Sequence, residues 1–445
     1  MYFARKIAIS MLYFVKNIQN SLNQRPLLWL FALLLLEIGL FSFIYKGFGN
    51  YLTPLVLLLI PFVWCKVFLS FHSKSQILAN NNIAKTGLFT LLGFLSIALL
   101  YEEFRKLFFG ADYMEITKSD ILPQIYYMVE YFLQGKSPYQ PIEEIPWKVQ
   151  SPYMPMHWLP FVLPYKLGID FRWLPVLVCA IGVALYGGYL STLNVPAIRK
   201  RYLLALPLVT LFLLIKYEFP FQYTVELLIT SYYLILTVGL AKKSFPLQLI
   251  GICLALLSRF MLIFWLPVYL LTLFLHESKK KAMIATLIII ASISVFYVIP
   301  FWIKDPSIFQ KGIEYHRKGI ENTWFRAADT TDFNTIKHSG VGISSIVFEV
   351  SKKDHASLSQ SISLMEKVHL ATCLLVVMGL GFWYHRNREK IAYNHFLLLL
   401  LKINITLFIV FNPMPYAYYY LSSLVISWFL FAEIATKIPE QKATF

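Results

Sequence analysis

The sequence predicts an all-α polytopic membrane protein with about twelve transmembrane helices, and three observations support this fold class. First, 58% of the 445 residues are apolar and only 14% are charged, a balance typical of membrane proteins rather than soluble domains. Second, long apolar runs alternate with short basic loops. Third, two polar segments, 102–171 and 304–367, are much longer than those loops. We expect residues 1–445 to form a single transmembrane domain that carries these two segments as long outer loops.

The apolar runs define the predicted spans in chain order. The run 245–275 is too long for one span of about 20 residues, so we predict two helices with Arg259 near the turn between them. The predicted spans are 26–45, 51–71, 87–101, 173–191, 202–215, 222–241, two within 245–275, 282–302, 368–384, 391–411 and one after the turn at 412–415. No cleavable signal peptide pattern precedes the first of them, so we expect that span to direct insertion.

Basic residues set the predicted orientation. The formal net charge is +16, and the proposed inner loops are all basic. The short outer turns contain only Lys46, Lys216 and Arg259 as basic residues. This distribution predicts a multi-pass protein of the cytoplasmic (inner) membrane with both termini cytoplasmic, and it favours contact with anionic membrane lipids over nucleic acid. The four cysteines lie in apolar runs, and no pair of histidines has metal-binding spacing, so we predict neither a metal site nor a cofactor.

The first long outer loop contains a predicted surface helix. After Asp120, apolar residues recur every three or four positions as far as Leu133, which predicts an amphipathic helix too short to cross a bilayer. Such a helix lies at the membrane surface. Gly135 ends it, and several prolines then prevent a new helix until about Met156. The following segment, 156–167, is predicted to be a surface or re-entrant element.

The same loop contains an ordered set of residues: an acid, an aromatic pair, a Gly-x-x-Pro-Tyr element and a later Tyr-x-Pro. They are Asp120, Tyr126-Tyr127, Gly135, Pro138-Tyr139 and Tyr153-Met154-Pro155. This order resembles the first outer loop of bacterial polyprenyl-phosphate-mannose-dependent mannosyltransferases, which belong to the GT-C superfamily. Met154 stands where that family usually has a proline.

The resemblance implies a GT-C fold and an inverting glycosyltransferase. It implies transfer of a hexose, mannose as the first guess, from a polyprenyl-phosphate donor to a lipid- or glycan-linked acceptor on the outer side of the membrane. It also implies that Asp120 is the catalytic base and makes Tyr126, Tyr127, Tyr139 and Tyr153 candidate substrate-binding residues.

The chemistry of this transfer requires a base for the acceptor hydroxyl and a cation for the departing phosphate. Asp120 is the candidate base, although a residue at this position also suits an N-cap of the surface helix. Asp112, Glu102 and Glu103 are reserve acids. Arg259 is the candidate donor phosphate-binding residue, because an arginine in an apolar run either lines a polar cavity or snorkels to a surface.

Further candidates lie later in the chain. His316, Trp324 and Arg326 in the second long loop offer ring stacking and hydrogen bonds to a sugar, with an ordinary solvated loop as the alternative. Tyr416, after the last outer turn, is a candidate that also suits an interfacial aromatic belt. Lys402, in the middle of a predicted span, and Glu226, one turn inside the outer end of another, are expected to pair with each other or with Arg259, or to serve a proton path.

Two other functions remain open from the sequence. A flippase or transporter for lipid-linked sugars is expected to have charges near the bilayer midplane, of which Lys402 and Glu226 are examples, and two similar halves, which the sequence lacks. A polysaccharide polymerase shares the long outer loops but not the Gly-x-x-Pro-Tyr element.

Overall fold

The computed structural model describes residues 25–43, 52–71, 83–217, 219–329, 342–353, 357–414 and 416–438. The regular secondary structure in these ranges is helical, and the only strand-like pairing there is one isolated bridge between Ile142 and Val149. Seven of the described helices are long and apolar enough to cross a membrane. The predicted all-α class is confirmed, and these seven candidate spans support the predicted membrane protein, while the count of about twelve spans and the GT-C fold stay predictions.

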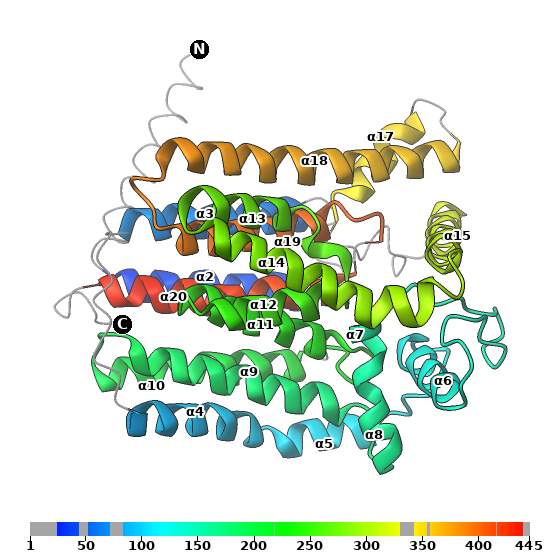
Figure 1. The fold of residues 1–445 in the computed structure, drawn as a ribbon, viewed down its shortest axis with the longest axis horizontal. Coiled ribbons are helices and arrows are strands. Elements are labelled where there is room, and N and C mark those ends of the chain that lie inside the picture. The colour runs from blue at the N-terminus through cyan, green and yellow to red at the C-terminus, as the bar shows by residue number, and fades with distance from the viewer. Residues whose placement is uncertain are drawn as a thin grey trace.

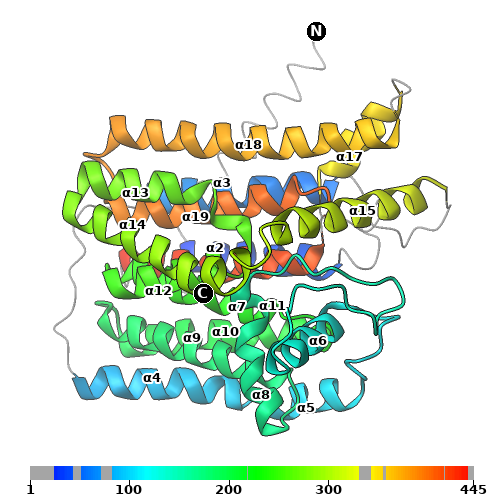
Figure 2. The same cartoon turned by 45° about the vertical axis from the view of Figure 1, so that its right-hand side comes forward.

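The apolar helices lie side by side with their axes along one direction (Figures 1 and 2). They are α2 (Pro26–Phe43), α3 (Leu52–Phe71), α4 (Ile83–Ala98), α9 (Trp173–Thr192), α10 (Ala197–Lys216), α11 (Glu226–Ala241), α12 (Phe245–Leu256), α13 (Trp265–His276), α14 (Lys279–Ile293), α18 (Leu358–Asn387), α19 (Tyr393–Val410) and α20 (Leu421–Lys437). The predicted division of 245–275 is confirmed, because a short 3₁₀ turn, η3 (Phe260–Leu262), separates α12 from α13. A π-helical turn, η4 (Ser294–Trp302), extends α14.

Helices α11, α19 and α20 form the centre of the bundle. Every residue of α11 is buried, and 89% of the apolar window of α19 is buried, against 22% for α14 and for α18. The outer helices therefore expose rows of large apolar side chains, as lipid-facing helices do. The apolar side chains of the central helices thus pack against other helices, whereas those of the outer helices face the surroundings of the bundle.

The remaining helices gather at one end of the bundle, on the right in Figure 1. They are α5 (Tyr101–Phe109), α6 (Ile121–Leu133), α7 (Pro155–Trp158), α8 (Val162–Leu167), α15 (Ile308–Asp329) and α17 (Ser344–Lys353), with the 3₁₀ turns η2 (Leu159–Phe161) and, before α20, η5 (Ala417–Tyr420). The predicted helix after Asp120 is confirmed as α6, which buries its apolar stripe and ends before Gly135 in the left-handed conformation. Gln124 of the same helix is also buried.

Three hydrogen bonds attach the first long loop to this end of the bundle. Ser119 Oγ donates to the carbonyl of Tyr223 at 3.1 Å. The Met156 amide donates to the carbonyl of Leu257 at 2.7 Å, and Tyr232 Oη donates to the carbonyl of Met156 at 3.1 Å. The loop is therefore held over the beginning of α11 and the turn after α12.

The loop begins later than the sequence predicts. After a turn at residues 99–100, the chain continues as helix α5 and carries Glu102 and Glu103 on a helix rather than on a loop. Phe104 and Phe108 are buried on one face of α5 while the charged residues face outward. This amphipathic pattern allows the helix to continue past the apolar run.

The segment 304–367 is also more helical than the predicted outer loop. It contains α15 and α17, and α18 begins at Leu358 rather than at 368. Ser357 and Gln360 form a capping box that starts α18 ahead of its apolar part. Its polar first turns are thus part of one 30-residue helix.

A buried ion pair crosses the middle of the bundle. Lys402 Nζ on α19 lies 2.5 Å from Glu37 Oε1 on α2, and both side chains are fully buried. Trp64 and Ser427 donate to the other Glu37 oxygen, and Lys402 also donates to Ser423. The partner of Lys402 is therefore Glu37 rather than Glu226 or Arg259, since two buried opposite charges satisfy each other best in direct contact.

We expect Lys402→Met to destabilise the protein by about 3–5 kcal/mol, because the substitution leaves the Glu37 carboxylate buried without its cation. Thermal unfolding of the purified protein in detergent measures this loss. The double variant Glu37→Gln with Lys402→Met is expected to recover most of it, since no lone charge remains. Lys216→Met, which breaks an exposed ion pair with Glu103, is the control and is expected to cost less than about 1 kcal/mol. Equal losses for Lys402→Met and Lys216→Met would contradict the assignment.

Candidate active site at the loop-covered end of the bundle

Arg259 and Glu226 form a paired charge at this end of the bundle. Arg259 lies in extended backbone between α12 and η3, and Glu226 is the first residue of α11. Arg259 Nη1 donates to Glu226 Oε2 at 2.8 Å, and Nη2 donates to Glu226 Oε1. The arginine side chain is 14% exposed and the glutamate is fully buried. The two-pronged contact fixes the plane of the guanidinium and leaves part of it accessible.

Tyr419 provides the second contact of this arginine. The guanidinium carbon of Arg259 lies 4.2 Å from the centre of the Tyr419 ring, which is cation–π geometry. Tyr419 belongs to η5, where it packs edge-on against Tyr416 and Tyr418. Arg259 is therefore held by a carboxylate and by an aromatic face, and it does not snorkel freely to the surface.

Asp120 lies directly before α6 but does not cap it. Its side chain makes no capping hydrogen bond, and Ser119 Oγ instead accepts from the Ile121 amide at 3.3 Å. The Asp120 carboxyl faces the side chains of Gln124 and Trp147 and is half-buried. Burial raises its pKa above the ordinary carboxyl value, and contacts with Gln124 and Trp147 partly oppose this rise. The capping alternative is thus not realised, and the carboxyl remains available for other contacts.

Tyr153 interacts electrostatically with both Asp120 and Arg259. Burial raises the pKa of its phenol, the Asp120 carboxylate raises it further, and Arg259 opposes the rise. Tyr419 likewise lies within electrostatic range of Arg259, Glu226 and Asp120. Asp120 and Arg259 therefore both influence the same two tyrosines electrostatically, and Arg259 is also in direct contact with the Tyr419 ring.

The His157 ring stacks against the Tyr153 ring. The two rings are stacked with centroids 3.9 Å apart and an interplanar angle of 12°. Burial, and then the positive charge of Arg259, hold the pKa of His157 well below its usual range, so the ring is neutral at neutral pH. Neither ring nitrogen has a hydrogen-bond partner among the described residues, although the backbone of Ser258 lies close by.

Other residues of the predicted pattern lie away from this cluster. Tyr126 packs against Tyr165 and Phe171, and Tyr127 packs edge-on against Tyr126. Tyr139 is buried, and its hydroxyl accepts from Trp158 Nε1 at 3.3 Å. Tyr126 and Tyr139 therefore help to build the loop that carries Asp120.

The second long segment contributes a different residue from those predicted. Trp324 is fully buried against Phe348, and its Nε1 donates to the carbonyl of Pro413 at 2.8 Å, so its ring faces a small core instead of a sugar. His316 is exposed on α15, and the side chain of Arg326 lies outside the described residues. Tyr315 is the α15 residue at the site: burial, followed by the nearby Asp120, raises its pKa to about 12.

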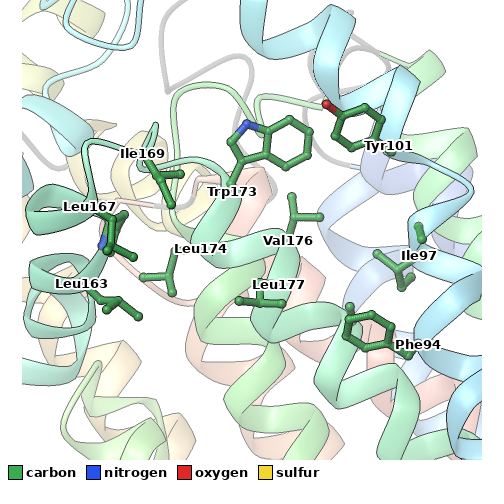
Figure 3. A pocket seen from close by; sticks show the side chains of 13 residues that line it. Phe94, Ile97, Tyr101, Leu163, Leu167, Ile169, Trp173, Leu174, Val176 and Leu177 are labelled. Carbon is green, nitrogen blue, oxygen red and sulfur yellow. The ribbon is translucent and has the colours of Figure 1, made fainter.

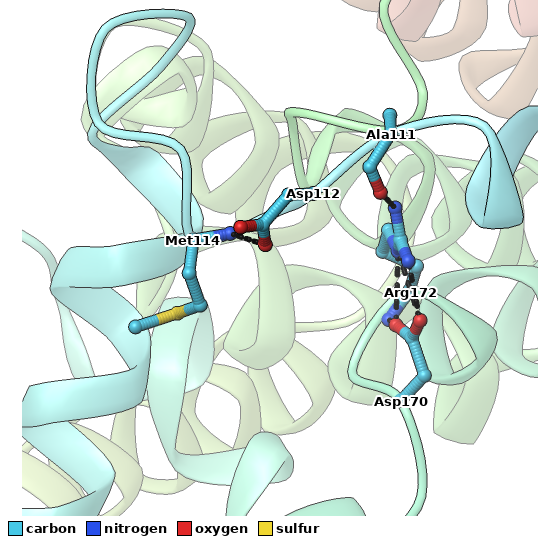
Figure 4. A network of polar contacts seen from close by, with 5 residues as sticks. All are labelled: Ala111, Asp112, Met114, Asp170 and Arg172. Atoms are coloured by element: carbon cyan, nitrogen blue, oxygen red, sulfur yellow. Dashed lines mark hydrogen bonds and ion pairs between the residues drawn. The ribbon is translucent and has the colours of Figure 1, made fainter.

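The reserve acids are engaged elsewhere. Asp112 is exposed, and its Oδ1 accepts from the amide of Met114 at 2.9 Å, in a turn beside the pair of Arg172 and Asp170 (Figure 4). Glu102 pairs with Arg105, and Glu103 pairs with Lys216 on the exposed surface. Of the predicted acids, Asp120 alone borders the arginine cluster in the described part of the chain.

Three residues at the site were not predicted from the sequence: Tyr315, Tyr419 and Trp147. Tyr419 lies in an aromatic run that is typical of an interfacial belt, and Tyr315 lies in a segment predicted to be a loop. Tyr315 follows Gly312 by about one turn of α15. At Gly312 the backbone of α15 approaches Pro152 so closely that an added Cβ would lie 3.2 Å from the Pro152 Cα. A helix assignment for α15 would have identified Tyr315. Among the described residues no group of three metal-ligating side chains is present.

Comparison with protein-family models, with curated proteins and with solved structures returned no match for this chain.

We expect Asp120→Asn to raise the thermal unfolding temperature at pH 7. A carboxyl with a raised folded-state pKa favours folding below its unfolded pKa, and this contribution is lost as the pH rises through the folded pKa. The gain of the variant should therefore be largest at neutral pH and shrink as the solution becomes acidic. Asp112→Asn, at an exposed site of the same loop, is the control. A variant less stable than the wild type at pH 7 would contradict this account of Asp120.

Proposed function

We propose that this protein is a GT-C-type membrane glycosyltransferase. It transfers a hexose from a polyprenyl-phosphate donor to the hydroxyl of a lipid- or glycan-linked acceptor, with inversion at the anomeric carbon. The observation that carries the proposal is a fixed, partly accessible guanidinium at the end of the bundle that the Asp120 loop covers: Arg259 contacts Glu226 and the Tyr419 ring, and both Arg259 and Asp120 interact electrostatically with Tyr153 and Tyr419. A carboxylate base and a phosphate-binding cation at one site are what this transfer needs.

The proposal includes twelve membrane crossings. The shorter apolar helices α2, α11, α12 and α13 run alongside the seven long ones, and α10 completes the set despite the basic residues of its first turn. The loops at the end opposite to α6 are basic, which favours a cytoplasmic location for that end. The candidate site then faces the outer side of the cytoplasmic membrane, and both termini are cytoplasmic.

In the proposed reaction Asp120 accepts the proton of the acceptor hydroxyl. The acceptor oxygen forms a bond to the anomeric carbon, and the bond from that carbon to the phosphate oxygen breaks with its electron pair. The raised pKa of Asp120 suits this role, because a base with a pKa nearer to neutrality transfers protons more effectively. The protonated carboxyl then returns its proton to solvent.

Arg259 binds the phosphate before and after the bond breaks. A guanidinium has five N–H donors, and Glu226 accepts two of them here, which leaves donors for an anion. Glu226 is a positioning residue, because both of its oxygens accept from Arg259 and neither is free to act as the base. Tyr153 and Tyr416 offer rings for contact with the sugar, and the resemblance to mannosyltransferases makes mannose the first sugar to test.

We expect Asp120→Asn to reduce sugar transfer by at least about 100-fold, because the amide cannot accept the acceptor proton. Purified protein, radiolabelled polyprenyl-phosphate mannose and a lipid extract provide the assay, with donor binding measured in parallel. Donor binding should be retained. Asp112→Asn is the matched control and should keep full activity. Full transfer by the Asp120 variant would remove the proposed base.

We expect Arg259→Lys to weaken donor binding by more than about ten-fold, since an ammonium cannot contact Glu226 and a phosphate in the same fork geometry. Arg259→Gln alone would leave Glu226 buried without a cation and destabilise the fold. The double variant Glu226→Gln with Arg259→Gln removes both charges, so it should remain folded but lose donor affinity. Unchanged affinity in the folded double variant would exclude Arg259 from phosphate binding.

A flippase or transporter for lipid-linked sugars is the second candidate, and the buried pair Lys402–Glu37 in the middle of the bundle favours it. The same purified protein in vesicles separates the two functions. Labelled glycan product indicates an enzyme, whereas movement of intact donor between leaflets indicates a carrier.

A further inference from the structure

A groove runs along the pair of helices α4 and α9, away from the candidate active site. The two helices touch backbone to backbone, because a Cβ added at Gly93 would lie 2.6 Å from the Val183 carbonyl oxygen, and one at Gly187 would lie 2.2 Å from that of Phe89. Beside this contact the structure has two pockets of about 330 and 620 Å³ that share Phe94 as a lining residue. We call these two neighbouring pockets together the α4–α9 groove.

The half of the groove near the active-site end is apolar. Its lining includes Tyr101, Trp173 and Leu177, which Figure 3 shows around the pocket. Tyr101 and Trp173 stack at a centroid distance of 5.1 Å and close its end. Leu177 is 48% exposed, as expected for a surface in contact with hydrocarbon.

The other half of the groove has polar and basic lining residues, and we call the end of the groove near Lys242 its foot. Thr86, Thr90 and Thr192 line it together with Lys242, which follows α11. Thr86 Oγ1 lies 2.9 Å from Ser191 Oγ, and Lys200 Nζ donates to the Ser191 carbonyl at 2.8 Å. Threonine hydroxyls and Lys242 therefore line the groove at this end, while Lys200 is buried behind them.

The residues that line this foot include a cation and no acid. Lys242 is exposed there, and no aspartate or glutamate is among the described residues of the lining. An anionic headgroup at the foot would therefore be attracted by Lys242 without repulsion from a lining carboxylate.

We propose that the α4–α9 groove binds one anionic phospholipid. Its phosphate lies at Lys242 and the threonine hydroxyls, and one acyl chain follows α4 toward Phe94. From Ile83 to Phe94 the helix rises by about 16 Å, close to half of a hydrocarbon core of about 30 Å. The groove thus matches a lipid of the leaflet at the basic end in charge and in length. This site is independent of the proposed transferase reaction.

The test uses the full-length protein purified in mild detergent and native mass spectrometry with added phosphatidylglycerol or phosphatidylcholine of identical chains. We expect one phosphatidylglycerol to be retained at several-fold higher occupancy than phosphatidylcholine. Lys242→Gln should reduce that occupancy on the order of five-fold, the effect of one lysine near a lipid surface. Lys243→Gln is the matched control, because it removes the neighbouring charge, which does not line the groove.

A second variant tests the chain-binding part. An added Cβ at Gly87 meets nothing within 4 Å, so Gly87→Phe fills the groove without a clash between the new Cβ and the protein. This variant should fold normally, as thermal unfolding will show, and should lose the retained lipid. The proposal is overturned if Lys242→Gln and Lys243→Gln lower occupancy equally, if both lipids are retained equally, or if folded Gly87→Phe retains phosphatidylglycerol as the wild type does.

Discussion

The contact on which this end of the molecule depends is the ion pair between Arg259 and Glu226. A lone charge among apolar helices would cost several kcal/mol, so each of these residues requires the other. Their two hydrogen bonds join the start of α11 to the turn between α12 and η3. The first long loop attaches to the same turn through Met156 and Leu257. Tyr419 covers the guanidinium from a third element, η5. The Arg259–Glu226 pair therefore lies at the point where α11, the turn after α12, the first long loop and η5 come together.

Two ion pairs of the described helices differ in how accessible their charged groups are. The pair of Lys402 and Glu37 is fully buried and surrounded by donors and acceptors from Trp64, Ser423 and Ser427. Such a closed network stabilises the contact between helices, because each charged group is surrounded by hydrogen-bond partners. The pair of Arg259 and Glu226 has an accessible guanidinium edge, with a side chain 14% exposed. An arginine whose guanidinium is held by a carboxylate and remains partly accessible can bind an anion with its remaining N–H groups.

Much of the local structure follows from spacing in the sequence. The three-and-four pattern after Asp120 predicts α6, and the interruption at Arg259 predicts the separation of α12 from α13. The helices α5 and α15 were missed because charged residues on their exposed faces resemble loop composition. Asp120 and Arg259 were identified as candidate site residues, but Trp324 was placed wrongly: an aromatic ring in a polar segment suits a sugar platform and a small buried core equally well.

Hydropathy and helical periodicity alone determined that this chain is an all-α membrane protein with amphipathic helices between its apolar ones, because both properties are local and repeat along the chain. Which charges pair was decided only by the tertiary structure. Glu37 and Lys402 are separated by 365 positions, and Tyr315 and Asp120 come from different long segments. Such contacts depend on how helices pack, and the periodicity of one helix contains no information about the partner that its polar residues will meet.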